Sequence, residues 1–406
     1  MEFNFQLESS SIVNILTLRY DPNLTPILPK KNWNDFKTKN YAPDISLIEN
    51  LISNNIYEKI NSLNAKKLCI ALSGGVDSTL ILSIIRKLFP SIEIEAISIK
   101  FANSVDETLD AQKIAEKFEA NHHVVSLENY LSELPKAINQ VELPFWDLHW
   151  YYVAKKSKTL SSILASGDGG DEIFGGYTFR YEKFLSLTND SSTPLEKVKV
   201  YLSCHERDRV PDQDLLFGSK SNFSWEKIYK TLLPYFDNPL PRLEQVFLAD
   251  YNGKLLYNFN PVNSRIAKNF GINLLAPLLD EKLISYGINI PNNFKYEPQQ
   301  NIGKLLLRKL LEKYQADSFV SNQKLGFNVN TINLWKSTGY EICKHFLLDS
   351  RIVKDGWIQK DWILKHIHKE KLDIKYINKF LGLLAFEVWY RLFITKELSK
   401  DTTLEI

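Results

Sequence analysis

The chain has 406 residues, of which 44% are hydrophobic and 24% charged, a balance typical of globular proteins of about two to three domains. Its formal net charge of +2 favours neither a nucleic-acid partner nor a strongly anionic one. The three cysteines, Cys69, Cys204 and Cys343, are widely spaced and form no CxxC pair, which argues against a disulfide framework and is typical of a reducing compartment.

The N-terminal residues 1–44 are weakly patterned, and we interpret them as an extension without a catalytic role. Short strands are expected around residues 12–18. Over residues 44–60 apolar side chains recur at helical spacing, and Asp44 is well placed to cap the first turn. This helix should lead into the first strand.

Residues 68–78, with the sequence LCIALSGGVDS, are the stretch around which the chain is organised. A short apolar run is followed at once by two glycines and then by apolar residues at helical spacing, which predicts a strand, a tight turn and a helix. Backbone N–H groups at the start of such a helix bind anions, and glycines let a polyphosphate approach closely. Asp77 stands where a phosphate-binding lysine would otherwise be expected. A carboxylate beside phosphates implies Mg²⁺ between them.

Strands and helices then alternate along the chain. Strands are expected at 92–99, 122–127 and 161–165, with helices at 106–118, 128–141 and 147–158. This alternation predicts a parallel sheet with helices on both faces, which binds its ligand at the carboxyl ends of the strands. From Tyr177 onward the pattern is mostly helical. The expected regions are therefore an extension (1–44), a nucleotide-binding region (45–185) and a helical part (186–406).

A second glycine-rich and acidic loop follows the strand at 161–165. It reads SGDGGDEIFGGY over residues 166–177. Because the carboxyl ends of parallel strands share one edge of the sheet, this loop is a plausible partner for the first.

The two loops together carry a family resemblance. SGGVDS resembles the pyrophosphate-binding loop of the ATP pyrophosphatases, and SGDGGDEIFGGY resembles a signature of the asparagine synthetase synthetase domain. KLLLR at 304–308, QKLGF at 323–327 and LGLLAFEVWYRLF at 381–393 are similar to later segments of that family. The resemblance implies an α/β fold of the ATP pyrophosphatase type, similar to the adenine nucleotide alpha hydrolases, with a mostly helical C-terminal half.

The resemblance also implies the chemistry. In this family a carboxylate attacks the α-phosphorus of ATP, pyrophosphate leaves, and a nitrogen nucleophile then displaces AMP to form an amide. Lys324 maps to the lysine that stabilises charge on the α-phosphate, and Asp168 to an acid near the acyl centre, where it could orient or deprotonate the amine. Lys304 is a weaker candidate for phosphate contact. The residues implied in ATP and pyrophosphate binding are Ala71, Leu72, Ser73, Gly74, Gly75, Asp77, Ser78, Ile99, Ser166, Gly167 and Arg265, and Asp77 and Asp171 are implied as Mg²⁺ ligands.

Two departures from the family pattern bear on the substrates. Glutamine-dependent members begin with a catalytic Cys and a glutaminase domain, whereas residue 2 is Glu2 and about seventy residues precede the SGGVDS loop. Nitrogen is therefore expected from free ammonia, a separate glutaminase subunit or an amine of the acceptor. Asn273 and Leu275 replace a charged pair of the family, which puts aspartate itself in doubt as the carboxylate. The carboxylate acceptor can therefore be either a small molecule or a peptide.

Several alternatives remain on the sequence alone. Plain asparagine formation competes with amide or macrolactam formation in specialised metabolism, of the β-lactam synthetase or lasso-cyclase type. A tRNA-modifying enzyme would require a basic flank or an RNA-binding module, and neither is apparent, so no nucleic-acid partner is expected. A binding protein that merely keeps the fold is disfavoured by intact Asp77, Asp171 and Lys324. No signal peptide or membrane span is visible, so a cytoplasmic location is expected.

The role that the resemblance gives Lys324 can be tested. Lys324→Ala is expected to leave ATP binding largely intact and to stop turnover, because the lysine acts on charge that develops during the reaction. Equilibrium binding of ATP and release of pyrophosphate measure the two effects separately. Normal turnover of the variant would refute the assigned role.

Overall fold

The computed structural model describes Phe5 and residues 7–36, 42–101, 108–205, 207–320 and 330–405. Its centre is a five-stranded parallel sheet in the order β3-β2-β1-β4-β5. The strands are β1 (Lys67–Ala71), β2 (Glu93–Phe101), β3 (Asn121–Leu127), β4 (Ile163–Ala165) and β5 (Asn273–Leu275). The predicted class, a parallel sheet with flanking helices, is confirmed.

The central strand β1 is buried from Leu68 onward, because neighbours on both edges and helices on both faces surround it. Its register pairs Ile70 with Ala96 of β2 on one side and with Ala165 of β4 on the other. The chain leaves β1 toward β2, but it reaches β4 only after passing through β3. The boundary between β1 and β4 is therefore the point at which the strand order reverses.

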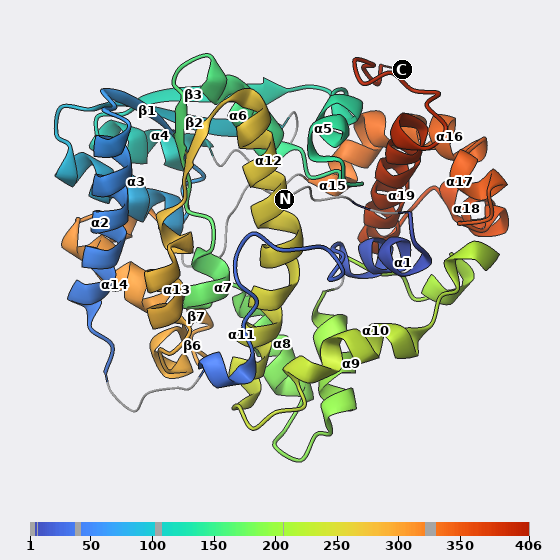
Figure 1. Cartoon of the computed structure of the whole chain (residues 1–406), viewed down its shortest axis with the longest axis horizontal. Helices are drawn as coiled ribbons and strands as arrows, with labels where there is room; N and C mark the ends of the chain where they lie inside the picture. The colour runs from blue at the N-terminus through green and yellow to red at the C-terminus, as the bar shows by residue number, and fades with distance from the viewer. Residues whose placement is uncertain are drawn as a thin grey trace.

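Helices cover both faces of the sheet (Figure 1). The right-handed crossover rule places α3 and α4 on one face and the connection that contains α6, which contacts β2, β3 and β4, on the other. The helices of this region are α2 (Ile45–Ser62), α3 (Val76–Leu88), α4 (Thr108–Lys117), α5 (Leu134–Val141), α6 (His149–Lys158) and α7 (Gly170–Phe174). The helix expected at 128–141 starts only at Leu134, because Pro135 fits the first turn of a helix and no later one.

The second half is helical, as its sequence predicts, apart from β5 and a small hairpin of β6 (Tyr296–Glu297) and β7 (Ile302–Gly303). The long column of α11 and α12 runs through the middle of the molecule, and α19 lies at its far side from the sheet (Figure 1). The main helices are α8 (Thr178–Leu187), α9 (Pro194–Cys204), α10 (Trp225–Leu232), α11 (Arg242–Asp250), α12 (Asn260–Phe270), α13 (Glu281–Gly287), α14 (Leu305–Lys313), α15 (Thr331–Leu334), α16 (Tyr340–Leu348), α17 (Arg351–Lys354), α18 (Lys360–Ile367) and α19 (Ile374–Phe393). Among the described helices, none combines the length and apolar character needed to cross a bilayer.

The expectation of strands around residues 12–18 was wrong. Ser9–Leu18 forms helix α1, which packs beside α19 (Figure 1). Its Ile12, Val13 and Leu16 are buried, and this tertiary burial outweighs the strand preference of β-branched side chains. The N-terminal segment is thus part of the folded body.

Glu49 links three helices at the edge of this body. It lies on α2 and accepts hydrogen bonds from Lys87 of α3 at 3.0 Å, from Lys313 of α14 and from the Tyr314 hydroxyl at 2.7 Å. Burial opposes ionisation of Glu49, but these hydrogen bonds outweigh burial and lower its pKa from 4.5 to about 2.

The depressed pKa of Glu49 predicts a pH dependence of stability. The stabilisation should be fully present above a pH of about 4.5 and be lost as the pH falls toward 2, because the unfolded state binds the proton first. Glu49→Gln should lower the free energy of unfolding at neutral pH by about 1–3 kcal/mol, a range reduced for the solvent exposure of the two lysines. It should also make the free energy of unfolding, measured by urea unfolding at a series of pH values, fall less steeply toward pH 2. The same acid dependence in wild type and Glu49→Gln would contradict the assignment.

Candidate active site

The first loop forms the turn that its sequence predicts. Gly74 has φ +72°, and Gly75 caps α3 without a side-chain bond. The hydroxyls of Ser73 and Ser78 lie 3.2 Å apart, and the Thr79 hydroxyl donates to the Gly75 carbonyl at 2.7 Å. The loop therefore holds its own shape while the N-terminus of α3 presents backbone N–H groups and a partial positive charge.

The second loop lies directly against the first. A methyl group at Gly167 would stand 2.6 Å from the Cβ of Asp77 and 2.9 Å from the Ser78 nitrogen. One at Gly170 would meet the Asp77 carboxylate at 2.4 Å, and one at Gly176 would meet an Asp171 oxygen at 1.8 Å. Gly167 and Gly170 are needed because the two loops touch, which the sequence could only suggest, whereas Gly176 leaves room for Asp171 within the second loop.

A lysine joins the acids of the two loops. The ammonium of Lys304 lies 2.5 Å from Asp77 Oδ2 and 2.7 Å from Asp171 Oδ1. Burial disfavours its charge, but Asp171 and Asp77 outweigh burial and raise the Lys304 pKa above the ordinary value. Lys304 precedes α14 with φ +57°, and its peptide N–H donates to the Phe174 carbonyl at 3.2 Å. The lysine thus occupies a cation position between the two carboxylates.

Both carboxylates fit a divalent metal ion. Two oxygens from Asp77 and Asp171 already face one cationic atom, and carboxylate oxygens are the ligands that Mg²⁺ prefers. The predicted pair of metal ligands is therefore brought together. Arg308, one helical turn beyond Lys304, lines the same cavity, as the i, i+4 spacing of the KLLLR segment requires.

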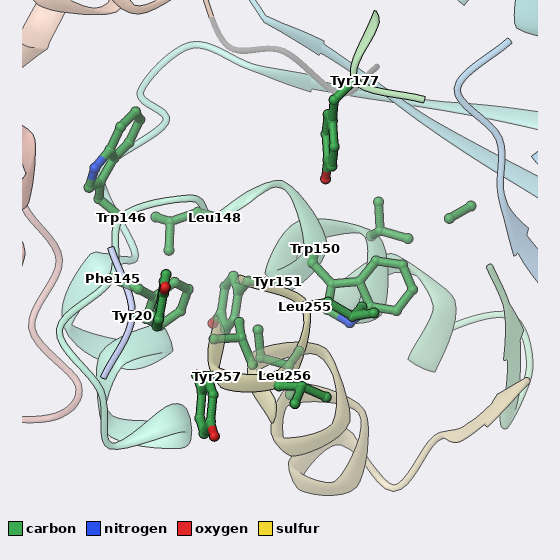
Figure 2. Close-up of a cluster of buried hydrophobic side chains, with 14 of the residues drawn as sticks. Tyr20, Phe145, Trp146, Leu148, Trp150, Tyr151, Tyr177, Leu255, Leu256 and Tyr257 are labelled. Atoms are coloured by element: carbon green, nitrogen blue, oxygen red, sulfur yellow. The ribbon is translucent and has the colours of Figure 1, made fainter. Parts of the chain in front are cut away.

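A cavity of about 930 Å³ extends from this point. Its lining includes Ala71, Ser73, Gly74, Gly75, Asp77, Ser78, Ser166, Gly167, Asp168 and Asp171 from the predicted set. Part of the lining is aromatic and includes Phe145, Trp146, Trp150 and Tyr177. Figure 2 shows Tyr177 on one side of this cluster, Trp150 and Leu255 on another, and Phe145 and Trp146 together. The cavity is large enough for a nucleotide and a second molecule together.

Asp168 lies in the cavity wall and accepts a hydrogen bond from Asn263 Nδ2 at 2.9 Å. Burial raises the pKa of Asp168, and the Asn263 bond acts against that effect. Asn263 is itself held, since its carbonyl accepts from the Trp150 indole at 3.2 Å. The carboxylate is therefore fixed in position, and its raised pKa suits a group that exchanges a proton.

The model of the asparagine synthase family matches residues 62–391. The chain belongs to this family. Asparagine synthetase [glutamine-hydrolyzing] 1 of Bacillus subtilis (strain 168) is 27% identical over 362 residues, which are 80% of this chain and 56% of that protein.

A putative asparagine synthetase [glutamine-hydrolyzing] of Mycobacterium bovis is 25% identical over 66% of this chain and 45% of its own length. The chain thus spans about half the length of the curated relatives it matches. Among solved structures, the NH3-dependent NAD synthetase of Campylobacter jejuni covers 42% of this chain and 90% of its own, with 16% identity and a TM-score of 0.26.

Some residues implied by the asparagine synthase resemblance lie elsewhere. Arg265 donates to the Val141 carbonyl and lies 3.8 Å from Glu142, and it is not among the described residues that line the cavity. Its predicted phosphate contact gains no support from this position. Leu72 and Ile99 are buried in the sheet region beside the cavity. Lys324 lies outside the described residues.

The two substituted family positions lie on β5. Asn273 is exposed and Leu275 is buried in the sheet, and neither belongs to the described lining of the cavity. Sequence reasoning did not anticipate that this segment pairs with β4. The position of Lys304 between Asp77 and Asp171 was not expected either, and its contact with phosphate stays a prediction.

The contact between the loops predicts an asymmetry between two glycine variants. Gly167→Ala should lower the free energy of unfolding by about 1–3 kcal/mol, because its methyl group meets backbone atoms of Asp77 and Ser78. Gly382→Ala, inside α19 with its nearest neighbour at 3.9 Å, should instead raise it by about 0.5–1 kcal/mol. Urea unfolding measures both. Equal effects of the two changes would mean that the loops do not touch.

Proposed function

We propose that the chain is an ATP-dependent amide ligase of the asparagine synthetase type. The observation that carries the proposal is the meeting of Asp77 and Asp171, from two loops about ninety residues apart, at one cation beside a helix N-terminus. Membership of the asparagine synthase family supports the same chemistry.

The proposed reaction has two steps. An oxygen of the acceptor carboxylate attacks the α-phosphorus of ATP, and the bond to the β-phosphate oxygen breaks with its electron pair leaving on pyrophosphate. An amine or ammonia then attacks the acyl carbon, loses a proton, and displaces AMP. The acceptor carboxylate needs this activation because its oxide is a poor leaving group and AMP is a good one.

Different residues act in the two steps. The backbone N–H groups around Gly74, Gly75 and the start of α3 bind the β- and γ-phosphates. Asp77 and Asp171 would hold Mg²⁺, which when bound supplies positive charge to the departing pyrophosphate. Lys304, which lines the same cavity, would contact these phosphates once Mg²⁺ takes its place between the two carboxylates. Asp168 orients the incoming amine and accepts its proton.

The acceptor lies on the aromatic side of the cavity in this proposal. The cavity volume of about 930 Å³ also favours a second candidate function, which is amide or macrolactam closure within an acceptor larger than aspartate. The two candidates share every step on the nucleotide and differ only in the acceptor and in the source of nitrogen.

A pyrophosphate-release screen tests the function. Carboxylic acids that include aspartate and larger amino acids are offered with Mg²⁺–ATP and with ammonia, glutamine or no added amine. Release that depends on one acid identifies the acceptor, and the nitrogen condition identifies the donor. ATP binding without release for any acid or donor would count against a ligase.

The metal-binding pair gives a sharper test. Asp77→Asn and Asp171→Asn should each reduce pyrophosphate release by at least about 100-fold, because a neutral amide no longer holds the divalent cation. Calorimetric titration with Mg²⁺ and a non-hydrolysable ATP analogue should show the corresponding loss of metal-dependent nucleotide binding. Asp190→Asn, whose fully exposed side chain is paired with Arg242 outside the cavity, is the matched control. Wild-type behaviour of either site variant would refute the assignment.

A further inference from the structure

Lys304 stands where the divalent ion is proposed to bind. Its ammonium lies 2.5 Å from Asp77 Oδ2 and 2.7 Å from Asp171 Oδ1, and Mg²⁺ would require such oxygens at about 2.0–2.1 Å. A lysine ammonium and a divalent ion cannot both lie between these two carboxylates, because their like charges repel strongly at so short a distance. The lysine and the metal ion are therefore competitors for one position.

The surroundings of Lys304 hold it in this position. A methyl group at Gly176 would meet Lys304 Cε at 2.4 Å and an Asp171 oxygen at 1.8 Å, so this glycine leaves room for both side chains. The backbone is fixed as well, since the Lys304 N–H donates to the Phe174 carbonyl at 3.2 Å and the Lys304 carbonyl accepts from the Arg308 N–H at 2.9 Å. The lysine side chain is 12% exposed, so solvent screens its two ion pairs only weakly.

A metal ion that arrived alone would have to displace this ammonium. The other carboxylates among the described lining residues of the cavity already have partners. The pairs are Asp147 with Arg19, Asp168 with Asn263, Glu172 with the Tyr177 hydroxyl, and Asp208 with Lys254. The displaced ammonium would therefore stay in the cavity wall without a counter-charge, which is costly.

Phosphates bound at the start of α3 would supply the missing counter-charge. The SGGVDS loop and Lys304 line the same cavity, and the flexible four-carbon stem of a lysine lets its ammonium move while its Cα stays in place. A metal ion that arrives with a nucleotide can therefore enter between the carboxylates while the ammonium moves to the phosphates.

We infer that Lys304 keeps a divalent ion out of the site until a nucleotide arrives, so that metal and nucleotide enter together. This inference rests on the proposed function, because it takes the position between Asp77 and Asp171 as the metal site and the start of α3 as the phosphate site. The lysine thereby couples two binding events that would otherwise be independent at the carboxylate pair.

Binding of a metal ion without nucleotide tests the exclusion of the free ion. Mn²⁺ is the probe, because it takes the same oxygen ligands as Mg²⁺ and its free ion is counted by electron paramagnetic resonance. Lys304→Met in the full chain should bind Mn²⁺ at least about 10-fold more tightly than wild type, since removal of the competing cation leaves two carboxylates unneutralised. The gain should disappear when Asp171→Asn is added to Lys304→Met.

Binding of a nucleotide without metal tests the transfer of the ammonium to the phosphates. A non-hydrolysable ATP analogue is titrated by calorimetry with EDTA present. Lys304→Met should bind this metal-free analogue at least about 10-fold more weakly than wild type, because the two carboxylates then repel the phosphates. One substitution thus strengthens the binding of one ligand and weakens that of the other, which a loss of structure would not do. Lys304→Gln, which keeps a polar side chain, should show both changes as well.

Controls separate this inference from the proposed function. Lys354→Met changes an exposed lysine that is paired with Asp349 at 2.5 Å outside the cavity, and it should alter neither affinity. If wild type and Lys304→Met bind Mn²⁺ equally, or bind the metal-free analogue equally, the role of Lys304 is refuted while the ligase proposal stands. If wild type fails to bind the analogue in the presence of Mg²⁺, the proposed function itself fails.

Discussion

The contact of the Lys304 ammonium with the partly buried carboxylates of Asp77 and Asp171 is the interaction on which the site depends. Asp77 and Asp171 could not lie this close together in a largely enclosed position without a cation, because their mutual repulsion and loss of hydration would be too costly. Lys304 supplies that cation and connects three separate parts of the chain, namely α3, α7 and the start of α14. The protein itself therefore holds the two carboxylates close together at one cationic atom, an arrangement of the kind that electrostatic preorganisation requires.

The sheet topology is what makes this contact available. β1 pairs with β4 although three connections and two strands separate them in sequence, and each strand ends in one of the two glycine-rich loops. Their pairing places both loops at one edge, where the strand order reverses and neighbouring connections leave in opposite directions. The glycines of the second loop leave room for the two carboxylates. Side chains at Gly167, Gly170 and Gly176 would each collide with Asp77 or Asp171.

The remainder of the chain encloses the cavity that this edge opens into. Lys254 lies on the π-helical segment Tyr251–Phe259 that joins α11 to α12, and Asn263 lies on α12. The connection before α6 carries Trp146 and Asp147, and the N-terminal segment carries Arg19. Buried apolar side chains form one connected cluster from Phe5 to Leu404, so these elements share one core. Arg19 belongs to the segment 1–44 that we interpreted as an extension, and it lines the cavity.

Local patterns determined much of this protein from the sequence alone. The cap of α2 by Asp44, the strand and glycine turn before α3, and the acidic second loop all depend on residues within about ten positions of one another, where spacing and turn chemistry decide the conformation. The nature of α1, the addition of β5 to the sheet, the bridging position of Lys304 and the entry of Arg19 into the cavity were decided only by tertiary structure. Each of these depends on partners far away in the chain, such as α19 for Leu16 or Asp77 for Lys304, and no local pattern records a partner that folding alone brings near.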